Sequence, residues 1–377
     1  MTDDELSATS WVSVSQGALA HNVRAIQKLL SEATPAPRVI AVVKANAYGH
    51  GAPEAARVLA AAGVDFFAVT TGEEALELRR SGVAAEILAF APPMHDQAAA
   101  LIQNDITLTV ADTENLAGIS KAAAIVQKTA SVHLKVDTGM GRLGVLPSEA
   151  VDLARAISVD PNVTLAGVYT HFGNALDKDE APTRKQLAVF QSVLKNLKDA
   201  GIDPGLRHCA NSAGVLLGSD YWMDAVRPGT ILYGQYPSAS LPKRLELRDS
   251  WKLKTRVVSV RRVPAGTAVG YGGEFVTKRA TTLAVLPIGY ADGFTVVPGS
   301  VASGKRGLKA LVRGLMKPGA QNTVTIRGKR FPVVGRVAMQ FCSVDVTNLT
   351  DVAVGDEVIV PARRVTSSSR LPRRYEE

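Results

Sequence analysis

The first residue in this sequence that could do chemistry is a lysine placed directly after an apolar run. Val39 to Val43 are apolar and predict a buried strand, and Lys44 follows them at once. A lysine at the end of a buried strand is partly desolvated, which lowers the pKa of its ammonium group. The neutral amine is the nucleophile of Schiff-base chemistry. A strand-end lysine can also simply reach solvent, so other residues must decide between the two interpretations.

Further polar residues follow the later apolar runs in the same way. They are Tyr48 after the first run, Lys135, Asp137 and Arg142 after the fifth, His171 after the sixth, Asn211 and Ser212 after the seventh, and Arg227, Gly229 and Thr230 after the eighth. The ends of parallel barrel strands converge on one mouth, so these residues are expected to meet there. Taken singly, His171 also fits a packed histidine and Arg227 a surface ion pair, but together they indicate a site.

The elements that must position these residues alternate between strand and helix. The predicted strands are Val39–Val43, Asp65–Val69, Glu86–Phe90, Ile106–Val110, Val132–Asp137, Val163–Thr170, Leu206–Cys209 and Asp224–Arg227. Segments with helical periodicity join each strand to the next. This pattern predicts an α/β fold with an N-terminal (β/α)8 barrel of the TIM type. An open doubly wound sheet is the alternative, but no G-x-G-x-x-G motif follows the first strand.

The pattern changes near Gly234, and helical periodicity does not return. Pro237 to Arg248 indicates a linker, and the predicted strands beyond it are Lys254–Val260, Thr281–Pro287, Thr323–Ile326, Phe331–Val334, Ser343–Val346 and Glu357–Val360. We therefore expect a barrel over residues 1–238 and a C-terminal all-β domain over residues 239–377. Residues 1–15, with a short strand from Trp11 to Ser15, could pack on the β domain. Gly299 to Gly319 is a basic, glycine-rich insert that predicts a surface loop.

The composition excludes several classes of protein. Among 377 residues no apolar run approaches the ~18 residues of a membrane span, so no membrane association is expected. The polar, acidic N-terminus is unlike a secretory signal, which favours a cytoplasmic location. Cys209 and Cys342 are too few for a disulfide framework or a cysteine metal site, and no metal is predicted. The net charge of +8 could indicate nucleic acid, but no such motif is present, so we favour an anionic small ligand.

A phosphate site beside a lysine points to pyridoxal 5′-phosphate (PLP). Hydroxyls and backbone N–H groups of the Ser212 and Gly229–Thr230 segments could hold a phosphate. PLP also needs a lysine for its aldehyde and a partner for its ring nitrogen. If that partner is Arg227, the ring nitrogen stays unprotonated, because a guanidinium does not give up its proton. The ring is then a weaker electron sink, which suppresses transamination.

With these residues identified, the chain resembles the bacterial alanine racemases, a family of fold-type III PLP enzymes. The matching segments, in family order, are Val43–Gly51, Lys135–Gly144, Tyr169–Phe172, Asn211–Ser212, Arg227–Gly229, Gly270–Gly272, Pro287–Gly293 and Gly335–Met339. The lysine segment is specific to the fold type. The Gly-Tyr-Gly segment around Tyr271, followed by Gly-Tyr-Ala-Asp-Gly, is specific to the racemases.

The resemblance implies a role for each matching residue in racemising L- and D-alanine. Lys44 forms the internal aldimine and is one proton-transfer base, and Tyr271 from the second subunit of a head-to-tail homodimer is the other. Arg227 bonds the ring nitrogen, and His171 connects it to Tyr271. Tyr48, Ser212, Gly229 and Thr230 hold the phosphate, and Asn211 also binds the cofactor. Arg142 and the Met339 backbone receive the substrate carboxylate, and Lys135 is carbamylated. The product would be D-alanine for peptidoglycan.

The chain departs from the family pattern at the substrate entrance. Gln340 stands where the family usually has aspartate, and Leu176 and Val296 replace an acidic and a basic residue. A C-terminal segment whose tyrosine adds to the phosphate site is missing after Val360–Pro361. These changes leave the PLP prediction intact but keep a broader amino-acid racemase open.

Other interpretations fit the sequence less well. A fold-type III decarboxylase would have a cysteine in place of Tyr271 and a carboxylate in place of Arg227. A non-catalytic PLP-binding protein would typically consist of the barrel alone, whereas this chain continues for more than a hundred residues past Trp251.

Overall fold

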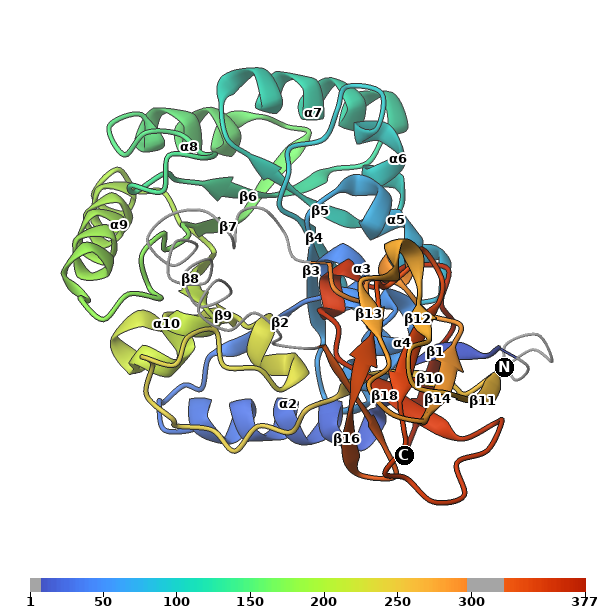
Figure 1. Ribbon diagram of the computed structural model, residues 1–377. Coiled ribbons are helices and arrows are strands. Elements are labelled where there is room, and N and C mark those ends of the chain that lie inside the picture. The colour runs from blue at the N-terminus through green and yellow to red at the C-terminus, as the bar shows by residue number, and fades with distance from the viewer. Residues whose placement is uncertain (1–7, 297–321) are drawn as a thin grey trace. The chain divides into compact units, whose positions relative to one another are not determined.

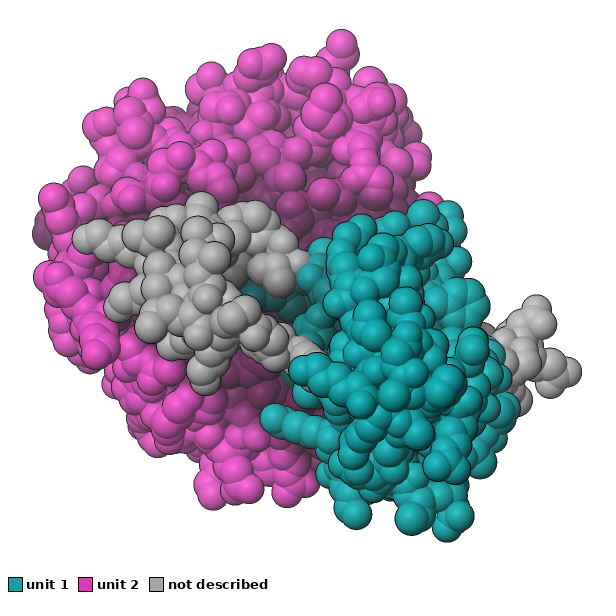
Figure 2. Space-filling model, in the orientation of Figure 1, with its two compact units in different colours: residues 1–15, 251–377 teal, residues 16–250 magenta. Residues whose placement is uncertain are grey.

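The computed structural model describes residues 8–296 and 322–377, and it divides the chain into two compact units (Figure 2). One unit contains residues 16–250, and the other contains residues 1–15 together with residues 251–377. The predicted loop at Gly299 to Gly319 lies outside the described residues. No helix within 8–296 or 322–377 is long and apolar enough to cross a membrane.

Residues 16–250 form a closed parallel barrel, which confirms the predicted fold class. Within the described residues its strands are β2 (Arg38–Val42), β3 (Phe66–Val69), β4 (Glu86–Ala89), β5 (Ile106–Val110), β6 (Ala130–Lys135), β7 (Val163–Tyr169), β8 (Leu206–Asn211) and β9 (Ala225–Arg227). The barrel closes where β2 pairs in parallel with β9, with Arg38 opposite Ala225. Ile40, Phe66 and Leu88 pack together in its apolar interior.

Helices lie outside the ring of strands (Figure 1). They are α2 (Gln16–Leu30), α3 (Lys44–Gly49), α4 (Ala52–Ala61), α5 (Gly72–Arg80), α6 (Ala98–Gln103), α7 (Thr113–Val126), α8 (Ala150–Val159), α9 (Ala181–Asp199) and α10 (Ser212–Leu217), with the short 3-10 helices η1 (Ser219–Tyr221) and η2 (Thr230–Tyr233). Leu19, Val23, Ile26 and Leu30 form the buried stripe of α2, at the spacing of an amphipathic helix. α2 thus covers the barrel with one apolar face.

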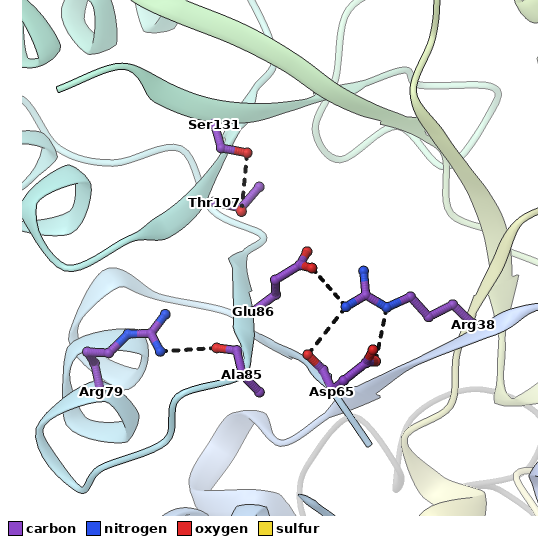
Figure 3. Close-up of polar contacts among 7 residues, drawn as sticks. All are labelled: Arg38, Asp65, Arg79, Ala85, Glu86, Thr107 and Ser131. Atoms are coloured by element: carbon purple, nitrogen blue, oxygen red, sulfur yellow. Dashed lines mark hydrogen bonds and ion pairs between the residues drawn. The ribbon is translucent and has the colours of Figure 1, made fainter. Parts of the chain in front are cut away.

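The N-terminal ends of the first strands are joined by structural ion pairs (Figure 3). Arg38 donates from Nε to Asp65 Oδ1 at 3.0 Å and from Nη2 to Glu86 Oε1 at 2.8 Å. Arg79 donates to the Ala85 carbonyl at 3.1 Å. In TIM barrels this end serves stability, while chemistry occurs at the opposite end. The carboxyl ends of the strands are therefore where a site is expected.

Residues 239–250 belong to the barrel unit, so the unit boundary lies between Ser250 and Trp251 rather than at the predicted 238. The amide of Asn22, on α2, pairs with both backbone groups of Arg248, at 2.8 and 2.9 Å. Ser250 Oγ bonds the ring of His50 at 2.9 Å. These contacts tie the proline-rich segment to the barrel, which composition alone could not indicate.

The other unit is built from β-strands, as predicted. Its described residues form a nine-stranded sheet in the order β11-β14-β17-β16-β15-β18-β10-β1-β19. The strands are β1 (Ser10–Ser15), β10 (Trp251–Arg256), β11 (Ser259–Val263), β14 (Thr281–Leu286), β15 (Thr323–Ile326), β16 (Lys329–Val334), β17 (Cys342–Asp345), β18 (Glu357–Val360) and β19 (Arg373–Glu376), and β12 (Ala268–Val269) pairs with β13 (Phe275–Val276). The N-terminal β1 pairs with both β10 and β19.

Candidate active site

All the barrel residues singled out from the sequence except Asp137 line two adjoining cavities at the carboxyl ends of the strands. One, of about 300 Å³, is bounded by Lys44, Tyr48, His171, Asn211, Ser212, Arg227, Gly229 and Thr230, among others. The second, of about 360 Å³, is bounded by Lys44, Lys135, Arg142 and His171 with an apolar wall that includes Phe90 and Leu143. Lys44 and His171 border both cavities, so a group bound in one adjoins the other.

Lys44 opens a one-turn segment with left-handed backbone geometry. Ala45, Asn46, Ala47 and Tyr48 have φ values of 51° to 54°. This conformation costs roughly 1–2 kcal/mol for each residue that is not glycine. The Ala47 amide donates to the Val43 carbonyl at 2.8 Å, and the Asn46 side chain accepts from the Ala52 amide at 2.7 Å. Strain held in this way at a cavity is typical of functional sites.

Two influences lower the pKa of Lys44 from its ordinary value. Burial is the larger, because it disfavours the charged ammonium, and the positive charge of Arg142 adds to it. The carboxylate of Glu74 opposes both. A larger share of Lys44 is therefore in its nucleophilic, neutral form than for a lysine in water.

The first cavity, which Arg142 does not border, is lined in part by hydroxyls and closely packed backbone. The Gly229 amide donates to Ser212 Oγ at 2.8 Å. A Cβ atom at Gly229 would collide with the Tyr48 hydroxyl, so only glycine leaves room for both. Burial raises the pKa of Tyr48 to about 12, which keeps its hydroxyl a hydrogen-bond donor. Asn211 has a structural role as well, because it caps α10 by accepting from the Ala213 and Gly214 amides.

Arg227 is 2% exposed and donates to four acceptors at the end of β9. Nη2 donates to the Thr170 carbonyl at 2.7 Å, the Cys209 carbonyl at 3.0 Å and His171 Nδ1 at 3.3 Å. Nη1 donates to His208 Nδ1 at 2.6 Å. Burial lowers the pKa of Arg227 to about 10, so it remains charged at neutral pH.

The arginine fixes the tautomers of the histidines around it. A guanidinium can only donate, so Nδ1 of His171 and of His208 must be unprotonated acceptors. His208 then carries its proton on Nε2 and donates it to His133 Nδ1 at 2.8 Å. Burial, and next the charge of Arg227, lower the pKa of His171 to about 2 and that of His133 to about 3. His171 is thus a neutral ring whose Nε2–H remains a donor.

Lys135 is buried and lies with Nζ 4.9 Å from the centre of the Tyr169 ring. Burial lowers its pKa well below the ordinary value, and the charges of Arg227 and Arg142 contribute. The Asp137 carboxylate, which partly opposes this shift, accepts the amides of Gly139, Met140 and Gly141 and so shapes the loop before Arg142. The charged form of Lys135 is therefore disfavoured.

Tyr271 and Met339 lie in the C-terminal unit. Tyr271 begins the 3-10 helix η3 (Tyr271–Gly273) and is 69% exposed, and Met339 is 57% exposed. The Tyr290 and Ala291 amides bond the Ala338 and Met339 carbonyls, which holds η4 (Tyr290–Asp292) against the Met339 segment.

Sequence reasoning missed the groups that hold the site residues in place. They are Glu74, His133, Tyr169 and His208, of which Tyr169 stacks on His208 at 4.9 Å. His133 and Lys135 are two residues apart on β6 and so share one side of the strand, which could have indicated a polar barrel interior. Thr71-x-x-Glu74 matches the capping-box pattern. Among the described residues, no group of three or more His, Cys, Asp or Glu side chains could hold a metal ion.

Comparison with known proteins gives one consistent match. The profile of the alanine racemase N-terminal domain matches residues 14–237, and that of the alanine racemase C-terminal domain matches residues 250–371. The alanine racemase of Methanococcus maripaludis is 39% identical over 93% of this chain and 88% of its own length. The structure of Clostridium difficile alanine racemase superposes with a TM-score of 0.88 at 32% identity, covering 98% of this chain and 96% of that one. Bacillus anthracis alanine racemase, solved with bound L-Ala-P, has a TM-score of 0.83 at 29% identity, over 98% of this chain and 95% of its own.

Proposed function

The chain belongs to the alanine racemase family, and we propose that it interconverts L- and D-alanine with PLP as its cofactor. The observation that supports this most is that Lys44 and Arg227 border the same cavity. Lys44 offers an amine with a lowered pKa, and Arg227 offers a buried donor that remains charged at neutral pH. Together they match the aldehyde and the ring nitrogen of PLP.

The cavity residues fit the remaining groups of the cofactor. The hydroxyls of Tyr48, Ser212 and Thr230 border the cavity, and the missing side chain at Gly229 leaves space against them. Donors of this kind suit a phosphate. When bound, PLP would take up part of the negative charge left at the substrate Cα after the proton departs. Arg227 would keep the ring nitrogen unprotonated, which limits this charge transfer and disfavours transamination.

Two bases on opposite faces of the substrate explain how a proton leaves one side and returns to the other. Lys44 would serve one face, and Tyr271 of the partner subunit in a head-to-tail homodimer would serve the other. A phenol has an ordinary pKa of about 10, so its phenolate needs stabilisation near neutral pH. The neutral His171 offers Nε2–H as a donor, and Arg227 behind it supplies the positive charge.

The substrate carboxylate would be received by Arg142 and by the Met339 backbone. Lys135 and Arg142 border the same cavity, and two cations there would repel each other. The neutral amine of Lys135 can instead add CO₂, forming an N–C bond and releasing a proton, to give a carbamate anion. That anion would orient the Arg142 guanidinium toward the carboxylate.

D-alanine for peptidoglycan, made in the cytoplasm, is the product we assign. A broader amino-acid racemase is the second candidate, supported by Leu176. This apolar residue lines the cavity and is 46% exposed, where the family has an acidic residue. Gln340 and Val296 also change the predicted entrance.

Chiral analysis of the full-length protein tests these proposals. With PLP present, L-alanine should become a racemic mixture, and L-serine and L-lysine measure the breadth. Absence of a PLP absorbance band would overturn the cofactor assignment, and release of CO₂ would indicate a decarboxylase.

A further inference from the structure

Glu74 makes contacts that exceed its role at the start of α5. Its Oε2 accepts the Thr70 amide at 2.8 Å and the Thr71 amide at 3.2 Å, and the Thr71 hydroxyl accepts the Glu74 amide at 3.4 Å. This is a capping box, which satisfies the free amides of a helix N-terminus. A capping box uses only one oxygen of the glutamate side chain, here Oε2. The other oxygen, Oε1, can therefore accept a hydrogen bond from another group.

That second oxygen bonds the residue next to Lys44. Glu74 Oε1 accepts the Ala45 amide at 2.6 Å. Ala45 is the first of the four left-handed residues that follow Lys44. One carboxylate therefore joins the loop after β2 to the loop after β3, and it fixes the turn at the point where Lys44 enters the cavity.

The same carboxylate places a negative charge where Arg142 places a positive one. Arg142, Lys135 and His171 border the cavity into which Lys44 projects, and Arg142 acts on Lys44 in the same direction as burial does. Glu74 acts in the opposite direction. Its position thus affects both where the Lys44 amine points and how readily it is protonated.

We propose that Glu74 is a positioning residue for Lys44: it anchors the left-handed turn through Ala45 and places a negative charge beside the amine. The proposal rests on the proposed function only for the role of Lys44 in the reaction. If Glu74 acted only by capping α5, removing the cap at Thr71 would disturb Lys44 as much as changing Glu74 does.

Three single variants of the full-length chain separate these cases. Glu74→Gln keeps the size of the side chain but has only one acceptor oxygen, and its charge is lost. Because two amides bond Oε2 and one bonds Oε1, the glutamine oxygen should face the two cap amides, and its NH₂ group, which cannot accept a hydrogen bond, should then face the Ala45 amide. Thr71→Ala removes the other half of the cap and leaves the contact between Glu74 and Ala45. Glu73→Gln is the matched control, because it removes one charge from the same turn of α5, where Glu73 bonds Gln97 rather than the Lys44 turn.

Two measurements on cofactor-free protein serve as readouts. Hydrogen–deuterium exchange at the Ala45 amide reports the anchor, and competitive amine labelling of Lys44 across pH, located by mass spectrometry, reports its ionisation. Glu74→Gln should speed exchange at Ala45 by roughly tenfold or more and move the Lys44 titration to lower pH. Thr71→Ala and Glu73→Gln should change neither.

The proposal is overturned if Glu74→Gln leaves both readouts at wild-type values, or if Thr71→Ala reproduces its effect on Lys44. If Glu74→Gln does not fold, Glu74→Asp replaces it, because aspartate keeps the charge on a shorter side chain. This variant should fold and speed exchange at Ala45, and its Lys44 titration should lie closer to that of the wild type. Neither readout requires turnover. A protein that shows both shifts but never racemises alanine would refute the proposed function and leave this inference standing.

Discussion

Acidification should destabilise the barrel through its buried histidines, well before carboxylates protonate. His133 and His208 are fully buried in one hydrogen-bonded chain with Arg227, which holds both rings neutral. Burial is the main cause that lowers the pKa of each, with the charge of Arg227 second. A histidine whose pKa falls on folding binds more protons when unfolded. Its contribution to stability is therefore present above the unfolded pKa and is lost as the pH falls.

The size of the effect follows from proton linkage. An unfolded histidine titrates near pH 6.5, and the pKa of folded His133 is about 3. Between those values each such histidine costs about 1.4 kcal/mol of unfolding free energy for every pH unit. If both folded rings stay unprotonated, they together cost roughly 2.5 kcal/mol between pH 6 and pH 5, slightly less than the limiting slope because unfolded histidines are not fully protonated at pH 6. Unfolded carboxylates have pKa values near 4 and contribute mainly below this window.

Urea unfolding of the cofactor-free protein at pH 7, 6 and 5 measures the slope. His133→Asn is the informative variant, because Oδ1 of asparagine can accept from His208 Nε2 as Nδ1 of His133 does. It should reduce the slope by about 1.4 kcal/mol per pH unit. His95→Asn, at an exposed ring, should leave the slope unchanged. A slope that is the same in wild type and His133→Asn would refute the assignment of neutral, buried rings.

Three further predictions concern the cavity. Gly229→Ala should weaken PLP binding by roughly tenfold or more, because its Cβ displaces the Tyr48 hydroxyl. Gly118→Ala, on α7 and outside both cavities, should not, and equal PLP dissociation constants for the two variants would count against the phosphate assignment. Lys135 should carry the added mass of one CO₂ in native mass spectrometry and lose it in CO₂-free buffer at low pH, and an unmodified lysine in bicarbonate buffer would contradict the carbamate. Tyr271→Phe should abolish solvent-deuterium exchange at Cα for one alanine enantiomer and spare the other, and equal losses would exclude the two-base assignment.

The barrel could be predicted from the sequence because its strands are short apolar runs separated by amphipathic helices. Ile106–Val110 was predicted with the bounds that the structure has, and the other barrel strands differ by a few residues at their ends. In the C-terminal unit, the predicted run Lys254–Val260 spans parts of both β10 and β11. The charged β19 (Arg373–Glu376) carries no apolar alternation, and it is a strand because it pairs with β1.

Only those residues of the candidate site that follow directly after a strand could be predicted from the sequence. Lys44 and Arg227 follow apolar runs, so the barrel rule places them at one mouth. The left-handed turn after Lys44 has no glycine until Gly49, and nothing in local propensity predicts it. Glu74 and His208 act through contacts between segments far apart in the chain. Such contacts depend on the folded barrel and leave little trace in the local sequence.

The central claim is that one active site takes Lys44 from one subunit and Tyr271 from the other, and mixed dimers test it directly. Lys44→Ala and Tyr271→Phe chains, each inactive alone, would be co-expressed with different affinity tags. Half of the dimers should be mixed, each with one intact site, so racemisation should return to about a quarter of the wild-type rate per subunit. If both residues acted within one chain, no mixed dimer would contain an intact site, and the absence of activity would contradict the account.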